Sequence, residues 1–208
     1  MQRIPPNPVV TKGLDVSHYQ GAIDFHAAKA AGFSFCYAKC SEYIEDDTFE
    51  RHRAGAKEAG LLYGAYHFFH PTKSPSEQAR IFLEHAKPQP GELLPTLDWE
   101  VTDGIASMVD RARALNWLEI VSAAIGGRKP IIYGAPYFLQ ALGLDAVTFA
   151  KYPLWIAHYG VNAPLVPSPW GTWCLWQNSE HGAAPGVSGG VDIDLFNGSL
   201  DAMRLLTI

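Results

Sequence analysis

The stretch LPTLDWEVTD (residues 94–103) joins an apolar run, as expected of a buried strand, to two carboxylates separated by one tryptophan. Successive side chains of a strand point to opposite faces, so Thr96, Asp98 and Glu100 share one face and the residues between them point the other way. Neighbouring acids on a partly buried face raise the pKa of at least one of them. Shifted pKa values gather at sites of acid–base chemistry, which makes this strand end the first candidate for an active site.

Strands and helices alternate on both sides of this stretch. Further strands are predicted at 9–17, 33–40, 61–69 and 129–134. Helices are predicted at 23–32, 47–60, 74–87, 107–125 and 136–143. Asp24, Asp47 and Ser74 stand where a side chain caps the first turn of a helix, and Pro75 suits the first helical position. The first two thirds of the chain therefore read as repeated strand and helix pairs.

The pattern changes after residue 150. Segments 152–159, 172–177 and 190–196 read as strands, whereas the connections between them are rich in proline and glycine and leave little room for helices. Eight strands, the first five followed by helices, favour a parallel barrel of the α/β class. We therefore expect a single domain with an irregular TIM-like (β/α)5(β)3 barrel over residues 12–208, preceded by an N-terminal extension at 1–11.

Composition narrows the classes of function. The 208 residues carry a formal net charge of −5 and no run of Lys or Arg, so neither nucleic acid nor an anionic membrane surface is expected as a partner. Aromatic residues make up 12% of the chain and suit both core packing and stacking on sugars. The three cysteines lack the spacing of a disulfide framework or a zinc site, and we expect buried thiols. No classical export signal is recognised, so the protein is expected to be made in soluble form in the cytoplasm.

Polar residues mark the ends of the predicted strands. In a parallel barrel the catalytic groups lie at the carboxyl ends of the strands, so these residues are expected to converge on one rim. The residues at or near these ends are Asp15, Lys39, His67, Asp98, Glu100, Tyr133, His158, Gln177 and Asp192.

Several short motifs follow one another in an order that resembles a known family. They are GLDVSHYQG (13–21), YAKCSE (37–42), GAYHFF (64–69), LDWE (97–100), IIYG (131–134), LWIAHY (154–159), LWQ (175–177) and GVSGGVDIDLF (186–196). Together they resemble the landmarks of the glycoside hydrolase family 25 lysozymes, the N,O-diacetylmuramidase type, over about residues 12–198. The resemblance implies a barrel of eight strands with five flanking helices. It also implies hydrolysis of the β-1,4 bond between N-acetylmuramic acid and N-acetylglucosamine in peptidoglycan.

The resemblance also implies roles for the acids. Glu100 would be the general acid, with Asp98 beside it, while Asp15 and Asp192 complete an acidic cleft. Glycosidic cleavage needs one carboxyl that stays protonated and another that stays ionised, which agrees with this division. Similar proteins use the N-acetyl group of the substrate as nucleophile, with an Asp that stabilises the oxazolinium ring. The backbone spacing of about 6.5–7 Å between same-face neighbours leaves the stereochemical outcome open.

Six further residues are expected to contact sugar. The resemblance suggests Tyr66, Tyr133 and Trp155 as platforms, and Lys39, His67 and Gln177 as hydrogen-bonding residues. Because Tyr66 and His67 are adjacent, they must face opposite sides of their strand. We therefore favour Tyr133 and Trp155 over Tyr66 as platforms. The histidines lack metal-ligand spacing, and neither a metal nor another cofactor is expected.

Two departures from the family pattern bear on function. Asp194 stands where asparagine is commoner, and no appended wall-binding repeat is present. We expect a monomer that acts on peptidoglycan glycan strands in the bacterial cell wall, after release as a phage lysin or delivery as a secreted effector.

Two other classes of protein fit the same acids. One is a metal-dependent deacetylase or amidase in which Asp98, Glu100, Asp192 and His67 bind a divalent cation. The other is a glycan-binding protein without turnover, although binding alone does not need four convergent carboxylates.

Overall fold

The computed structural model describes the whole chain, residues 1–208, and places eight strands in a closed barrel in the order β10-β2-β3-β4-β5-β6-β7-β9. The barrel strands are β2 (Thr11–Val16), β3 (Phe35–Ser41), β4 (Leu62–Phe68), β5 (Thr96–Asp98), β6 (Ile131–Gly134), β7 (Leu154–Ala157), β9 (Leu175–Gly182) and β10 (Val191–Phe196). A separate two-stranded sheet pairs β1 (Gln2–Arg3) with β8 (Leu165–Val166). The predicted eight-stranded barrel is confirmed.

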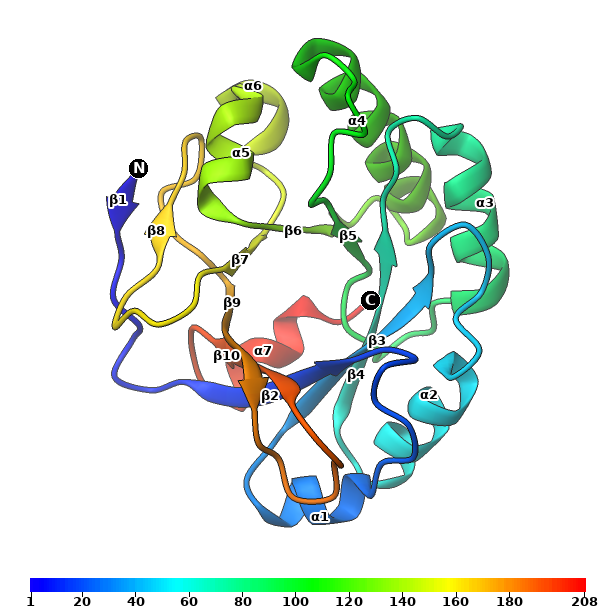
Figure 1. Cartoon of the computed structure of the whole chain (residues 1–208), viewed down its shortest axis with the longest axis vertical. Helices are drawn as coiled ribbons and strands as arrows, with labels where there is room; N and C mark the ends of the chain where they lie inside the picture. Colours follow the sequence, from blue (N-terminus) through cyan, green and yellow to red (C-terminus); the bar gives the residue numbers. More distant parts are fainter.

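Helices follow each of the strands β2 to β6 and lie outside the barrel (Figure 1). They are α1 (Phe25–Ala30), α2 (Phe49–Glu58), α3 (Pro75–Ala86), α4 (Ser107–Ala124), α5 (Pro136–Leu142) and α6 (Ala146–Phe149). No helix lies between β7, β9 and β10, which confirms the predicted (β/α)5(β)3 arrangement. The chain ends with α7 (Leu200–Met203) and η1 (Arg204–Leu206). None of these helices has the length and apolar character needed to cross a membrane.

The prediction of a wholly parallel barrel is wrong for one strand. β10 is antiparallel to both of its neighbours, β2 and β9, whereas all other neighbouring pairs in the barrel are parallel. A short connection between β9 and β10 allows this reversal, since antiparallel strands need no crossover helix. The amino end of β10 therefore lies at the same rim as the carboxyl ends of the other strands.

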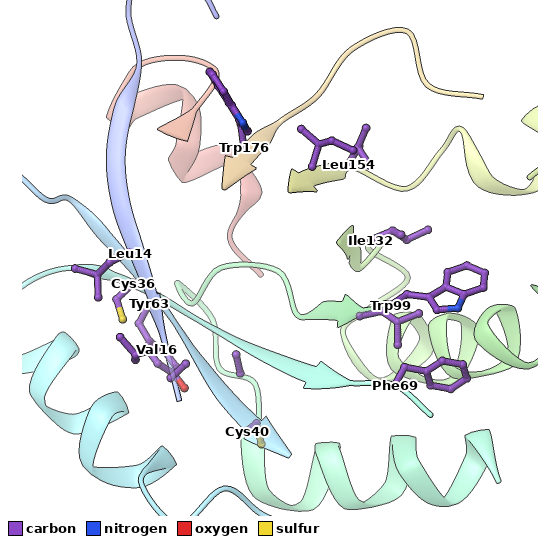
Figure 2. Packing of buried hydrophobic residues seen from close by; sticks show 14 of the residues in the cluster. Leu14, Val16, Cys36, Cys40, Tyr63, Phe69, Trp99, Ile132, Leu154 and Trp176 are labelled. Atoms are coloured by element: carbon purple, nitrogen blue, oxygen red, sulfur yellow. The ribbon is translucent and has the colours of Figure 1, made fainter. Parts of the chain in front are cut away.

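Alternation along the strands creates two separate cores. Side chains such as Leu14, Cys36, Ile132 and Leu154 point outward and pack under the helices (Figure 2). The alternate residues point inward and fill the barrel, among them Phe35, Tyr37, Ile131, Leu175 and Phe196. Leu94, which precedes β5, and Met203 of α7 pack against them. The C-terminus lies within the ring of strands in Figure 1, and Leu94 N donates to Leu206 O at 2.8 Å. The lower end of the barrel, where the parallel strands begin, is therefore closed. A site can form only at the upper rim, where these strands end.

Two of the three predicted helix caps are confirmed. Asp24 accepts a hydrogen bond from Ala27 N, and Ser74 accepts one from Glu77 N. The predicted cap at Asp47 is wrong, because α2 begins one residue later with Thr48 as its N-cap. All three cysteines are free thiols, two of them buried and Cys174 half-buried.

Close packing inside the barrel gives a first testable prediction. Gly64 of β4 lies opposite Tyr37 of β3, and a Cβ atom at Gly64 would lie 2.2 Å from the Tyr37 ring. Gly64→Ala should lower the free energy of unfolding by about 1–3 kcal/mol, because the fully buried ring must move. Denaturant unfolding measures this change. Gly171→Ala is the control, since a Cβ atom at that position would meet no other atom within 4 Å. Equal effects of the two substitutions would contradict the packing described.

Candidate active site

A cavity of about 220 Å³ opens at the upper rim of the barrel. All four predicted acids line it, and so do four of the six predicted sugar-contacting residues. These eight residues are Asp15, Tyr66, Asp98, Glu100, Tyr133, Trp155, Gln177 and Asp192. Thr96, Tyr159 and Glu180 complete the lining. The rim therefore gathers residues from most of the barrel strands around one acidic pocket.

The position of Asp192 depends on the reversed strand. Asp192 lies near the amino end of β10 and pairs in register with Asp15, near the carboxyl end of β2. In a wholly parallel barrel the start of the last strand would lie at the opposite end. Antiparallel pairing brings both carboxyls to the same rim. Burial and the charge of Asp15 raise the pKa of Asp192 to about 8.

Asp98 is the last residue of β5, and Glu100 lies two residues beyond it. The Asp98 side chain is buried, whereas Glu100 is exposed at the mouth of the cavity. Burial raises the pKa of Asp98 well above its ordinary value, and the charge of Glu100 beside it raises it further. The Glu100 carboxyl lines the cavity, where its partial desolvation also raises its pKa, although contacts with Asp98 and Tyr133 and the charge of Lys39 oppose this shift. The pair therefore keeps a proton at pH values where an ordinary carboxyl group is ionised.

Gln177 connects the two walls of the cavity. Its Oε1 accepts hydrogen bonds from the hydroxyl groups of Tyr133, at 2.7 Å, and Tyr159. Its Nε2 donates to Asp15 Oδ2 at 2.8 Å. Both ends of the amide are thus used, which fixes the orientation of the group and of the tyrosines beside it.

A further carboxyl lies beneath the cavity. Asp194 is fully buried, and its Oδ1 accepts a hydrogen bond from Trp155 Nε1 at 3.0 Å, whereas its Oδ2 has no partner other than the neighbouring Asp15 carboxyl. Burial raises the pKa of both carboxyls well above the ordinary value; the charge of Asp194 raises that of Asp15 further, whereas the contact with Asp15 lowers that of Asp194. Two adjacent buried carboxyls cannot both be ionised without a large cost, so they share a proton.

Exposure reverses the predicted ranking of the aromatic platforms. Trp155 is 1% exposed and Tyr133 6% exposed, so both form the floor of the cavity. Tyr66 is half-buried, and Tyr159, which the sequence analysis did not select, is 37% exposed. These two rings offer more surface to a ligand.

Two predicted sugar-contacting residues do not line the cavity. Lys39 lies beside it, and its ammonium group pairs with Glu42 at 2.5 Å. His67 is fully buried on the outward face of β4, where it stacks on Trp117 with 5.6 Å between ring centroids. His67 therefore does not lie where it could contact a ligand in the cavity.

The surroundings of His67 explain its role in the core. Its ring nitrogens lie 2.9 Å from Ser41 Oγ and 3.1 Å from Gln78 Oε1. Burial lowers the pKa of His67 to about 4, so the ring is neutral near pH 7. His158, another predicted rim residue, accepts a hydrogen bond from Leu165 N and does not line the cavity.

The missed residues had weak signals in the sequence. Tyr159 follows His158, and alternation alone did not show which of the two turns inward at the strand end. Glu180 lies on the part of β9 that extends beyond the predicted end at residue 177. No group of three or more His, Cys, Asp or Glu side chains is arranged to hold a metal ion.

Comparisons with known proteins identify the same family over most of the chain. The family model described as "Glycosyl hydrolases family 25" matches residues 14–187. Lysozyme M1 of Streptomyces globisporus is 35% identical, over 98% of this chain and 73% of that protein. An N,O-diacetylmuramidase of Arthroderma benhamiae is 29% identical, over 93% of this chain and 85% of that protein. The crystal structure of a bacterial lysozyme from Streptomyces coelicolor superposes with a TM-score of 0.91 at 34% identity, and covers 97% of this chain and 98% of that one.

The buried Asp194 carboxyl predicts a dependence of stability on pH. A carboxyl whose pKa is raised by folding stabilises the protein below its ordinary pKa, and this contribution is lost as the pH rises towards the folded-state value. Asp194→Asn should keep the acceptor for Trp155 and add a donor towards Asp15. We expect the variant to exceed the native protein at pH 8 by about 1 kcal/mol or more in free energy of unfolding, with a smaller difference at pH 5.

Denaturant unfolding at the two pH values measures this effect. Asp201→Asn is the matched control, because the Asp201 side chain is 97% exposed. An equal loss of stability at both pH values for Asp194→Asn would contradict the shared-proton account.

Proposed function

The chain belongs to glycosyl hydrolases family 25, the family of lysozymes and muramidases, and is therefore a glycoside hydrolase; on this premise we propose that Glu100 is its general acid. The proposed reaction is hydrolysis of the β-1,4 bond between N-acetylmuramic acid and N-acetylglucosamine in bacterial peptidoglycan. The observation that supports the assignment is the position of Glu100, which is exposed at the mouth of the acidic cavity beside the buried Asp98.

The two carboxyls differ in depth, which suits different roles. Glu100 is exposed at the mouth, where it can reach the oxygen of a bound glycosidic bond, and Asp98 lies deeper. Because the pair holds one proton, Asp98 is a carboxylate whenever the proton is on Glu100. In that state Glu100 protonates the leaving oxygen, and Asp98 stabilises the positive charge that develops on the sugar.

Asp98 and Glu100 lie together at the end of β5, and each shifts the pKa of the other. Two-carboxylate glycosidases place their acids about 5 Å or more apart, so that a sugar or a water molecule fits between them. We propose instead that the N-acetyl group of the substrate attacks the anomeric carbon, with Asp98 accepting a hydrogen bond from the amide N–H. The oxazolinium ring is then opened by water, which returns a proton to Glu100.

The remaining cavity residues suit sugar binding. Tyr66 and Tyr159 present rings at the walls, and the Gln177 network fixes Tyr133 and Asp15 between them. Burial raises the pKa of Asp15 and of Asp192, and the charge of Glu100 raises both further, so these two acids interact directly with the proposed general acid. A single chain supplies all the lining residues, so we propose that it acts as a monomer on peptidoglycan strands in the cell wall, as a phage lysin or secreted effector.

Glu100→Gln tests the assignment of the acid. The amide keeps the shape of the side chain but has no proton to give, so the rate of wall lysis should fall by about 10²–10⁴-fold while binding to insoluble peptidoglycan is retained. Glu180→Gln is the matched control at the same cavity and should lose less than about tenfold, since Glu180 acts only through its charge. Lysis by Glu100→Gln at the native rate would contradict the proposal.

The products and a chelator separate the other classes. Mass spectrometry of digested peptidoglycan should find muramic acid at the new reducing end, whereas glucosamine there would place the cut at the other bond. Activity should be unchanged in excess EDTA. Inhibition by EDTA that added metal reverses would support the metal-dependent alternative.

A further inference from the structure

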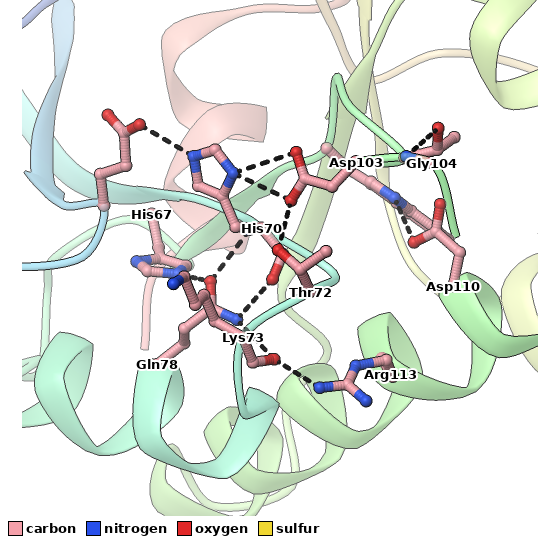
Figure 3. Close-up of polar contacts among 12 residues, drawn as sticks. His67, His70, Thr72, Lys73, Gln78, Asp103, Gly104, Asp110 and Arg113 are labelled. Atoms are coloured by element: carbon pink, nitrogen blue, oxygen red, sulfur yellow. Dashed lines mark hydrogen bonds and ion pairs between the residues drawn. The ribbon is translucent and has the colours of Figure 1, made fainter. Parts of the chain in front are cut away.

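A charged cluster outside the cavity centres on His70. Its Nε2 lies 2.9 Å from Glu42 Oε1, and its Nδ1 lies 3.1 Å from Asp103 Oδ2 (Figure 3). Each residue belongs to a different connection at the upper rim: Glu42 follows β3, His70 follows β4 and Asp103 follows β5. The imidazole therefore joins three segments that are far apart in the sequence.

The position of His70 is fixed by its backbone. His70 N donates to Gln78 Oε1 at 3.0 Å, and Gln78 Nε2 donates back to His70 O at 3.0 Å. The ring of Tyr43 stacks on the imidazole with 4.3 Å between centroids. The side chain is 13% exposed, so neither water nor a change of rotamer readily replaces its two contacts.

Geometry requires both ring nitrogens to donate. A neutral imidazole has one N–H, and its other nitrogen would present a lone pair to a carboxylate oxygen. The contacts with Glu42 and Asp103 are therefore both favourable only in the imidazolium form. The partners agree with this, because contacts with His70 help to hold the pKa of both carboxyls below the ordinary value despite partial burial.

The other charged groups around His70 are few. Lys39 pairs with Glu42, and Lys73 lies over the outer Tyr43 ring at 5.4 Å. Arg113 of α4 donates to Lys73 O and does not reach the imidazole, and His67 is held neutral by burial. Glu42 and Asp103 are thus the two charged groups that contact the ring nitrogens.

The cluster reaches the proposed acid by two routes. Asp103 follows Glu100 by three residues and has a φ of 48°, a left-handed conformation that costs a non-glycine residue free energy unless contacts hold it. His70 supplies one such contact, and Thr72 Oγ1 donates a hydrogen bond to Asp103 Oδ2 at 2.9 Å. On the other side, Glu42 holds the Lys39 ammonium group, whose charge acts on Asp98 and Glu100.

We propose that His70 is a positioning residue for the hydrolysis: as an imidazolium ion bridging Glu42 and Asp103, it holds the segment that carries Glu100 in its catalytic position. This inference rests on the proposed role of Glu100. Loss of the proton from His70 turns one of the two ion pairs into a repulsive contact and releases the segment. Activity then depends on two protons, one on Glu100 and one on His70.

His70→Gln tests the bridge, since glutamine is neutral and cannot link both carboxylates as a cation. With a soluble peptidoglycan fragment, kcat should fall on the order of 10-fold with KM changed less than about twofold, because positioning affects the transition state more than binding. On the alkaline side, log kcat of the native enzyme should approach a slope of about −2, and that of the variant a slope of about −1. His85→Gln is the matched control, because His85 pairs with a single carboxylate, Glu45, at a half-exposed site.

A second readout does not depend on activity. Nitrogen NMR of the histidine rings, at a pH where the enzyme is fully active, should show His70 with both nitrogens protonated and His67 neutral. A neutral His70 ring at that pH, or native kcat and an unchanged alkaline slope in His70→Gln, would overturn the inference while Glu100→Gln stays inactive. Full activity of Glu100→Gln would instead overturn the proposed function and leave the NMR result to decide the bridge.

Discussion

Asp98 ends β5, which is held between β4 and β6, and Glu100 follows two residues later, so that both carboxyls line the same cavity. Asp98 and Glu100 are therefore forced together, and the burial of Asp98 prevents water from screening their repulsion. The least costly solution is to keep a proton between them. The residue between the two acids completes this constraint, since Trp99 packs into the outer core and donates from Nε1 to Asp110 at 3.0 Å.

The rest of the rim is arranged around this shared proton. Asp15 and Asp192 meet across an antiparallel pair, and Asp194 lies buried beneath them. Burial raises the pKa of all three carboxyls, so this end of the barrel holds several protons, whereas the charge of Lys39 lowers the pKa of Asp98 and Glu100. Gln177 and the tyrosines orient these groups by hydrogen bonds that need no charge. Apolar side chains fill the barrel below these carboxyls.

Much of this could be predicted from the sequence, because two regularities are local. The period of two placed Asp98 and Glu100 on one face, and strand–helix alternation up to residue 150 predicted the barrel and its five flanking helices. The direction of β10 could not be predicted in this way, since alternation is the same for parallel and antiparallel strands. His67 was misplaced because its strand position allowed either face, and only the packing of Trp117 and Gln78 shows which one it takes. The bridge at His70 joins segments about 30 residues apart, and nothing in the local sequence indicates it.

The central claim is that Asp98 and Glu100 share a proton at the mouth of the barrel. A carbon-13 NMR titration of the two side-chain carboxyls tests it most directly. The account predicts that the pair titrates in two coupled steps, the second of them well above the ordinary carboxyl range of about 4. Two independent titrations near pH 4, each unaffected by replacing the other residue with its amide, would contradict it.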